Sequence, residues 1–130
     1  VSQWTASMFN GKVCKPRLGL GSKVECTDLR LDEKTKSLVQ DGMRDVCMSG
    51  GTAFPFFDLD GKVYCKTGTA QHGGEETEPH AWITVVVPEG EDRNQWIVVT
   101  VLLPEAGEGS AVAGPVARKI VDHLLEDEVL

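Results

Sequence analysis

Two nearly uninterrupted apolar runs in the second half of the chain constrain its fold more than any other feature. Ile83 to Val87 and Ile97 to Leu103 are rich in β-branched residues, and the polar segment 88–94 separates them. Such residues favour strands, and the length of the intervening segment suits an antiparallel hairpin. Because both runs are apolar at almost every position, we expect both faces of these strands to be covered by other elements.

A third strand and a terminal helix complete this half of the chain. The three expected strands are 62–69, 81–87 and 95–103. After them, apolar residues recur at three- and four-residue intervals from Val112 to Leu125, which predicts a helix with a wide apolar stripe. Pro115 is compatible with that helix because it lies close to its start. The predicted fold class is therefore α+β: an antiparallel three-strand meander flanked by helices.

Smaller elements are predicted in the first half of the chain. They are a helix over 3–9, strands over 12–18 and 23–26, and a helix over 32–48. Asn10 and Gly11 are expected to end the first helix, and Asp32 is a favourable N-cap for the second. Pro16 restricts the first strand to a sheet edge, because proline has no N–H to donate.

Length and charge limit the classes of protein to which the chain can belong. Its 130 residues suffice for one domain. The net charge of −7 argues against nucleic acid as the main partner, because phosphate binding needs a cationic surface. No apolar run approaches the roughly 20 residues that cross a bilayer. Val1 is not a natural start residue, which suggests a piece of a longer protein.

Four cysteines, at positions 14, 26, 47 and 65, leave the disulfide state open. The absence of a C-x-x-C pair argues against a structural zinc site. Free, partly buried thiols are the favoured interpretation, because such cysteines behave as small hydrophobic residues. Cys65 in particular is predicted to be a buried free thiol inside a strand. If a disulfide forms, Cys14 and Cys26 are the better candidates, since they flank a glycine-rich turn.

No metal site and no cofactor is predicted from the remaining polar residues. His72, His80 and His123 are widely spaced, so solvent-exposed or capping roles are expected for them. Asp58 and Asp60 stand in the sequence D-L-D-G, but the rest of a twelve-residue calcium loop is missing. A turn is therefore predicted at these two aspartates.

The residues Lys66-Thr67-Gly68-Thr69 end the first strand of the meander with an unusual combination of groups. The lysine provides a positive charge, and the Thr67 hydroxyl can donate a hydrogen bond to a carboxylate. Gly68 removes a side chain where another group has to lie flat against the backbone. The backbone N–H of Thr69 can point at a developing oxyanion. Together these groups suit a site that receives an acyl group with a carboxylate nearby.

Flanking segments give this K-T-G-T sequence a specific context. G-G-T-A at 50–53 precedes it, His80-Ala81-Trp82 opens the next strand, and G-E-G-S at 107–110 leads into the terminal helix. K-T-G is one of the three motifs of the penicillin-interacting serine acyltransferases. In order and spacing, the chain from about Asn10 to Leu125 resembles the C-terminal part of the transpeptidase domain of a penicillin-binding protein. The monofunctional, class B type fits best.

The resemblance implies a role for each residue of the motif. Lys66 would lie near the nucleophile and help to hold the substrate, and the Thr67 hydroxyl would bind the carboxylate of a terminal D-alanine or of a β-lactam. Gly68 would let the substrate backbone lie alongside the strand, and the Thr69 N–H would form half of the oxyanion hole. Lys66 and Thr69 are thus the candidate catalytic residues, and all four are candidates for substrate binding. The implied fold is a five-stranded antiparallel sheet, of which this chain contributes three strands.

The chain departs from the family in one important respect, because it lacks the S-x-x-K and S-x-N motifs. Its serines are Ser2, Ser7, Ser22, Ser37, Ser49 and Ser110. None is followed by lysine at the third position or by asparagine at the second. An acyl-enzyme cannot form without an activated nucleophile. We therefore expect residues 1–130 to be an incomplete domain that is inactive alone.

The favoured hypothesis is a segment of a peptidoglycan D,D-transpeptidase that cross-links stem peptides through a serine acyl-enzyme and binds β-lactams. The resemblance implies a parent protein that acts outside the cytoplasmic membrane and is anchored there by an N-terminal segment. A β-lactam-sensing receptor domain, a serine β-lactamase and a non-enzymatic module that kept the fold remain alternatives. Besides stem peptides and β-lactams, the expected partner is the remainder of the domain or a second copy. Either would pair along strand 95–103, which carries no charge and no proline.

Overall fold

The computed structural model describes residues 1–19, 21–74, 77–89 and 95–126. The elements in chain order are α1 Ser2–Asn10, β1 Lys12–Cys14, β2 Cys26–Asp28, α2 Glu33–Val46, the 3₁₀ helix η1 Phe54–Leu59, β3 Tyr64–Ala70, β4 His80–Glu89, β5 Gln95–Leu103, the π-helical turn η2 Gly109–Ala113 and α3 Gly114–Glu126. Most of the predicted turn 88–94 lies outside the described residues. Of the helices within them, none combines the length and apolar character needed to cross a membrane.

Strands β3, β4 and β5 form the predicted antiparallel meander, with β4 in the middle. Tyr64 pairs with Val86 and Ala70 with His80, which aligns β3 along β4. From Ile83 to Val87, every residue of β4 is buried, so the middle strand is covered on both faces. In β5, by contrast, no residue is fully buried. The expected coverage of both faces is therefore correct for β4. In β5, Val99, Val101 and Leu103 pack against the buried core and Trp96 packs against Phe9 of α1, so both faces have a neighbour. Most of its residues stay only half-buried because β5 lies at the edge of this sheet.

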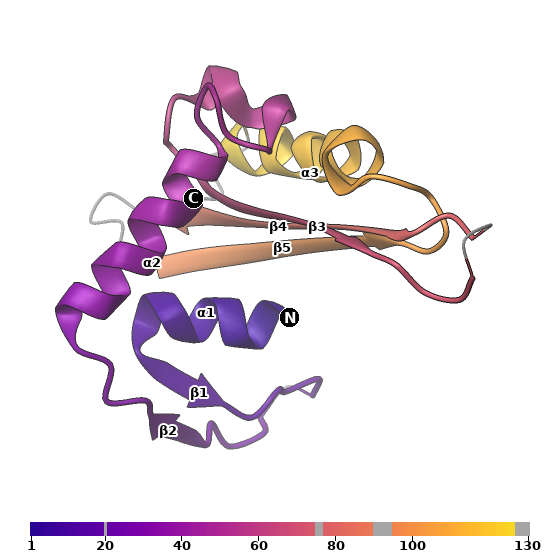
Figure 1. Ribbon diagram of the computed structural model, residues 1–130. Helices are drawn as coiled ribbons and strands as arrows, with labels where there is room; N and C mark the ends of the chain where they lie inside the picture. Colours follow the sequence, from indigo (N-terminus) through magenta and orange to yellow (C-terminus); the bar gives the residue numbers. More distant parts are fainter. Residues whose placement is uncertain (20, 75–76, 90–94, 127–130) are drawn as a thin grey trace.

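Helices α3 and α1 lie on opposite sides of the sheet (Figure 1). Toward α3, strand and helix residues form one buried cluster that includes Cys65, Ile83, Val85, Ala117 and Val121. Toward α1, the Phe9 ring packs against the rings of Tyr64 and Trp96, with centroid distances of 4.9 and 5.0 Å. Successive side chains of a strand point to opposite faces. The odd-numbered positions of β3 therefore face α3.

The first helix and the β1–β2 hairpin follow the predicted order. Helix α1 ends at Asn10 and is capped by Gly11, whose φ of 74° is left-handed and whose N–H donates to the Ser7 carbonyl at 2.9 Å. The two strands are shorter than predicted, and the second begins at Cys26 instead of Lys23. The ladder stops soon after Cys14 because Pro16 cannot donate a hydrogen bond. A disulfide joins Cys14 to Cys26, the pair named as the better candidate if a disulfide forms. The favoured interpretation of free thiols is wrong, because all four cysteines form disulfides.

Helix α2 and strand β3 are joined by a second disulfide, which the sequence analysis did not anticipate. Asp32 caps α2 as predicted, since its carboxylate accepts the Thr35 N–H at 2.9 Å. Cys47 follows the end of α2 and bonds to Cys65 in β3, and both residues are fully buried. The prediction that Cys65 is buried is confirmed. The prediction that it is a free thiol is wrong, because the end of α2 packs directly against β3.

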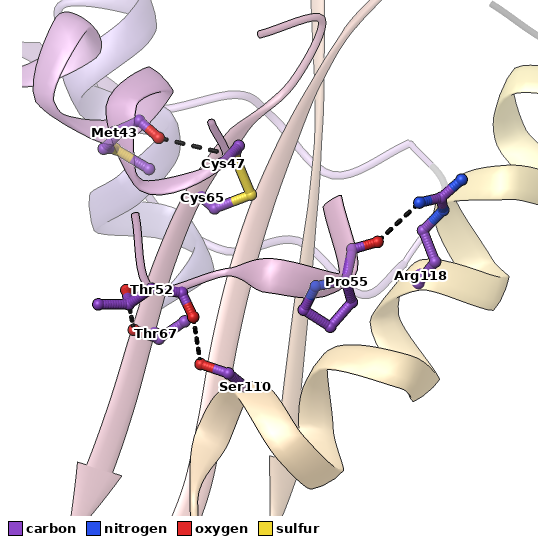
Figure 2. The surroundings of a disulfide bond; sticks show 8 residues. All are labelled: Met43, Cys47, Thr52, Pro55, Cys65, Thr67, Ser110 and Arg118. Atoms are coloured by element: carbon purple, nitrogen blue, oxygen red, sulfur yellow. Dashed lines mark hydrogen bonds between the residues drawn. A yellow bond between two sulfur atoms is a disulfide. The ribbon is translucent and has the colours of Figure 1, made fainter. Parts of the chain in front are cut away.

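Arg118 in α3 links this helix to η1. Its guanidinium donates to the Pro55 carbonyl at 2.6 Å and to both carboxylate oxygens of Asp58 (Figure 2 shows Pro55 and Arg118). These hydrogen bonds hold the pKa of the Asp58 carboxyl below its usual value. The Nε of Arg118 also donates to the Asp122 carboxylate at 2.6 Å. In the D-L-D-G segment, Asp60 forms a left-handed turn as predicted, whereas Asp58 lies inside η1.

Candidate functional site

The motif Lys66-Thr67-Gly68-Thr69 occupies the second half of β3, which is an edge strand of the three-stranded sheet. Cys65 is buried immediately before it, whereas Lys66 and Thr69 are exposed and the two residues between them are half-buried. The outer edge of β3 has no neighbouring strand among the described residues. The four residues therefore lie together beside an edge where an extended ligand can pair with the backbone.

Thr67 is held on the α3 side of β3 by a second threonine. Its Oγ1 lies 2.8 Å from the Oγ1 of Thr52, in the connector between α2 and η1 (Figure 2). The carbonyl of Thr52 in turn accepts a hydrogen bond of 2.5 Å from the Ser110 hydroxyl at the start of η2. A short chain of hydrogen bonds thus runs from the terminal helical segment through the connector to the motif strand.

Thr69 is contacted from the same side. Its hydroxyl oxygen accepts the backbone N–H of Gly109 at 3.4 Å, a long hydrogen bond. The odd-numbered positions 65, 67 and 69 of β3 therefore each have a partner: a disulfide, a hydroxyl and a backbone N–H. This arrangement fixes one face of the strand and leaves its outer edge open.

Gly68 lies between two close neighbours. A β-carbon placed on it would lie 3.2 Å from the Cβ of Trp82. A β-carbon on Gly109 would lie 2.5 Å from the Gly68 carbonyl oxygen, so the start of η2 rests on this part of the strand. The sequence predicts a group that lies flat against Gly68. Gly109 does not fill the position of the missing side chain, because Trp82 supplies the atoms within 4 Å of a β-carbon built on Gly68, so the predicted group stays a prediction.

Lys66 has its side chain beside the strand. Its ammonium donates to the carbonyl oxygen of Thr67, the next residue. This contact keeps the positive charge of Lys66 next to the Thr67 carbonyl. The four predicted site residues thus lie side by side in the second half of β3, next to its open edge.

Thr52, Gly109 and Ser110 support the motif, a role that the sequence alone did not indicate for them. The sequence placed Ser110 at the cap of the terminal helix, whereas its hydroxyl donates to the Thr52 carbonyl. All three supporting residues belong to the G-G-T-A and G-E-G-S segments that flank the motif. The glycines and hydroxyl residues of these two segments were the features of the sequence that could have indicated a contact with the motif strand. Their contacts with β3 depend on how the connector and η2 fold over the sheet, so sequence spacing alone does not reveal them.

Two histidines lie beyond the end of β3. The rings of His72 and His80 stack with their centroids 3.9 Å apart, although the sequence analysis treated these residues as scattered. His80 accepts the backbone N–H of Glu105 at 3.0 Å, in the turn that follows β5. Both histidines are half-buried, so neither is solvent-exposed as one of the expected roles required. Within the described ranges, no three histidine, cysteine or acidic side chains are grouped so that they could hold a metal ion.

Comparisons with known proteins agree with this geometry. The family model "Penicillin binding protein transpeptidase domain" matches residues 1–122. A curated relative, the peptidoglycan D,D-transpeptidase MrdA of Haemophilus influenzae, is 36% identical over 87 residues, which cover 57% of this chain and 13% of MrdA. The chain therefore spans only a small part of that relative.

A solved structure gives the same fold. The crystal structure of PBPA from Mycobacterium tuberculosis matches 96% of this chain and 31% of its own length, with a TM-score of 0.64 and 20% sequence identity. At this identity the likeness concerns the fold, and it confirms the predicted α+β architecture of helices around an antiparallel sheet. With a family match over nearly its whole length, the chain belongs to the transpeptidase domain family of penicillin-binding proteins, as the resemblance to the class B type predicted.

Proposed function

We propose that residues 1–130 are the C-terminal part of the transpeptidase domain of a peptidoglycan D,D-transpeptidase. The parent protein would cross-link stem peptides through a serine acyl-enzyme and bind β-lactams at the same site. The observation that carries this proposal is the position of Lys66 to Thr69 on an edge strand of a domain that matches the family over residues 1–122.

The Thr67 hydroxyl is the proposed ligand of the substrate carboxylate. A threonine hydroxyl has one proton to donate and two lone pairs to accept with. The contact with Thr52 uses one of these sites and leaves others open. Lys66 would add the positive charge that a carboxylate requires, and Gly68 would leave room for the substrate backbone along the strand.

The Thr69 N–H is the proposed oxyanion donor. In an antiparallel pair, successive residues alternate between bonding the neighbouring strand and pointing their N–H and C=O away from it. Thr67 and Thr69 therefore share one orientation. The Thr67 carbonyl accepts the Lys66 ammonium, which supports an outward orientation for both residues. A backbone donor aimed at an oxyanion contributes about 3 kcal/mol to transition-state stabilisation.

The nucleophile and the base would come from the rest of the parent protein. No serine of this chain stands in an S-x-x-K or S-x-N sequence. On this proposal the isolated chain forms no acyl-enzyme. The parent would act outside the cytoplasmic membrane, anchored by a segment that is not in this chain. The disulfides Cys14–Cys26 and Cys47–Cys65 support that location, because disulfides persist in oxidising compartments.

A labelled penicillin tests the proposal in the full-length parent. Thr67→Val should slow acylation roughly tenfold or more, since it removes a hydrogen bond to a charged group. Thr27→Val is the matched control, because Thr27 is exposed in the separate β1–β2 sheet. Equal acylation rates for the two variants would refute the role of Thr67.

Turnover separates the proposed enzyme from the alternatives. A transpeptidase joins two stem peptides, a serine β-lactamase hydrolyses the β-lactam, and a receptor domain stays acylated without making a product. Incubation of the parent protein with stem peptide, followed by mass spectrometry, should reveal a cross-linked dimer. Rapid β-lactam hydrolysis without any cross-linked product would favour the β-lactamase.

A further inference from the structure

The connector between α2 and η1 is a closed turn with little freedom. The backbone N–H of Ala53 donates back to the Val46 carbonyl at 2.9 Å. Gly51 lies so close to this helix end that a β-carbon on it would be 2.4 Å from the carbonyl oxygens of Asp45 and Val46. Thr52, between Gly51 and Ala53, is therefore carried in one position relative to the end of α2.

Two links join this connector to the motif strand on one face (Figure 2). The Cys47–Cys65 disulfide is the first, and the Thr52–Thr67 hydroxyl contact of 2.8 Å is the second. Positions 65 and 67 point to the same side of β3, since side chains alternate along a strand. Thr52 is thus held in register with Thr67, and the Ser110 hydroxyl fixes the Thr52 carbonyl from the other side.

We propose that Thr52 is a positioning residue that directs the hydroxyl proton of Thr67 toward a ligand carboxylate. Either hydroxyl of the pair can be the donor. A carboxylate accepts hydrogen bonds and has no proton to give. When one binds Thr67, the Thr67 proton points to the carboxylate, and Thr52 becomes the donor to the Thr67 oxygen. Hydrogen bonds in such a chain polarise and strengthen one another.

This inference rests on the proposed function, because it deepens the role given to Thr67. The proposed role of Thr52 also predicts a selectivity between charged and neutral ligands. Thr52 should matter for ligands that carry a carboxylate and should be indifferent for neutral ones. Thr52 is exposed and Thr67 half-buried, so solvent weakens the contact. The expected effect of losing it is therefore roughly threefold to tenfold in the acylation rate.

The test uses the full-length protein and two probes, a penicillin and its neutral methyl ester. Thr52→Val should slow acylation by the penicillin roughly threefold to tenfold and leave acylation by the ester within about twofold. Thr52→Ser keeps a hydroxyl and should restore the original rate. Thr27→Val is again the control for a threonine-to-valine change. The melting temperature of each variant shows whether the fold is kept.

The outcomes distinguish this inference from the function on which it rests. If Thr67→Val discriminates against the penicillin and Thr52→Val behaves like Thr27→Val, the inference is wrong and the proposed function stands. Equal slowing of both probes by Thr52→Val, or failure of Thr52→Ser to restore the rate, means a purely structural role and overturns it. If neither Thr52→Val nor Thr67→Val alters acylation, the proposed site itself is wrong.

Discussion

Gly109, the first residue of η2, lies against the backbone of Gly68 in β3. A β-carbon at position 109 would be 2.5 Å from the Gly68 carbonyl oxygen and 2.4 Å from that of Trp82. Such distances require the backbone itself to shift. The terminal helical segment therefore rests on the motif strand at a separation that only glycine permits.

Gly109→Ala should destabilise the protein by about 2 to 3 kcal/mol, because the added methyl group overpacks a site walled by backbone. It should also weaken the Gly109–Thr69 hydrogen bond. Gly42→Ala is the matched control, since Gly42 lies inside α2 with no atom within 4 Å of its ideal Cβ. That change should be neutral or stabilising. Thermal melts of the two full-length variants test this prediction. Equal melting temperatures for Gly109→Ala and Gly42→Ala would contradict the packing argument.

Arg118→Lys should lower the melting temperature although it keeps the positive charge. The guanidinium contacts the Pro55 carbonyl, both oxygens of Asp58 and one oxygen of Asp122. A lysine ammonium cannot reproduce this planar, bidentate arrangement. Lys119→Arg, at an exposed neighbouring position, makes the reverse exchange and should change little. A melting temperature for Arg118→Lys within the error of the unmodified protein would show that these contacts are dispensable.

Asp58→Asn should reduce stability near neutral pH and matter less in acid. Hydrogen bonds from Arg118 lower the pKa of Asp58 in the folded protein, so the ionised carboxylate favours folding. This contribution is present above the unfolded pKa of about 3.9 and is lost as the pH falls through the lower folded pKa. The melting temperatures of Asp58→Asn and of the unmodified protein should therefore approach each other as the pH is lowered from 7 to 3. A difference in melting temperature that stays constant over this pH range would rule out this linkage.

The two disulfides should differ in their accessibility to a reductant under native conditions. Cys26 is exposed, whereas Cys47 and Cys65 are fully buried. A mild reductant followed by alkylation should label Cys14 and Cys26 first. Cys47 and Cys65 should require denaturant. Mass spectrometry of the labelled peptides gives the order, and labelling of all four at one rate would contradict it.

The isolated chain should associate through the outer edge of β5. No residue of β5 is fully buried, and the strand contains neither charge nor proline. Such an edge pairs readily with another chain, here a second copy or the remainder of the domain. Sedimentation at micromolar concentration should show species larger than a monomer.

A charge on that edge provides the control. Leu102→Lys should reduce the association, because Leu102 lies in β5 and is 41% exposed. Leu38→Lys makes the same change in α2, where Leu38 is 73% exposed, and should leave the association as it is. If the unmodified chain is a monodisperse monomer that melts cooperatively, the outer edge of β5 does not pair with another chain and the prediction is wrong.

Local patterns in the sequence were sufficient to predict most of the elements. The Asp32 cap and the Gly11 stop depend on residues next to them in the chain, and both are confirmed. Strand 95–103 is predicted with its observed bounds because its apolar run is continuous. The short hairpin strands were misplaced, since weak pairing beside Pro16 leaves their ends to the surrounding structure.

The sequence by itself determined the family, the α+β architecture and the strand that carries Lys66 to Thr69, because these follow from patterns within short stretches of chain. Only the tertiary structure decided what holds that strand. The Cys47–Cys65 disulfide, the Thr52–Thr67 contact and the approach of Gly109 to Gly68 join segments 15 to 41 residues apart. Their formation depends on how α2, the connector and η2 pack over one face of β3, and no local propensity specifies that packing.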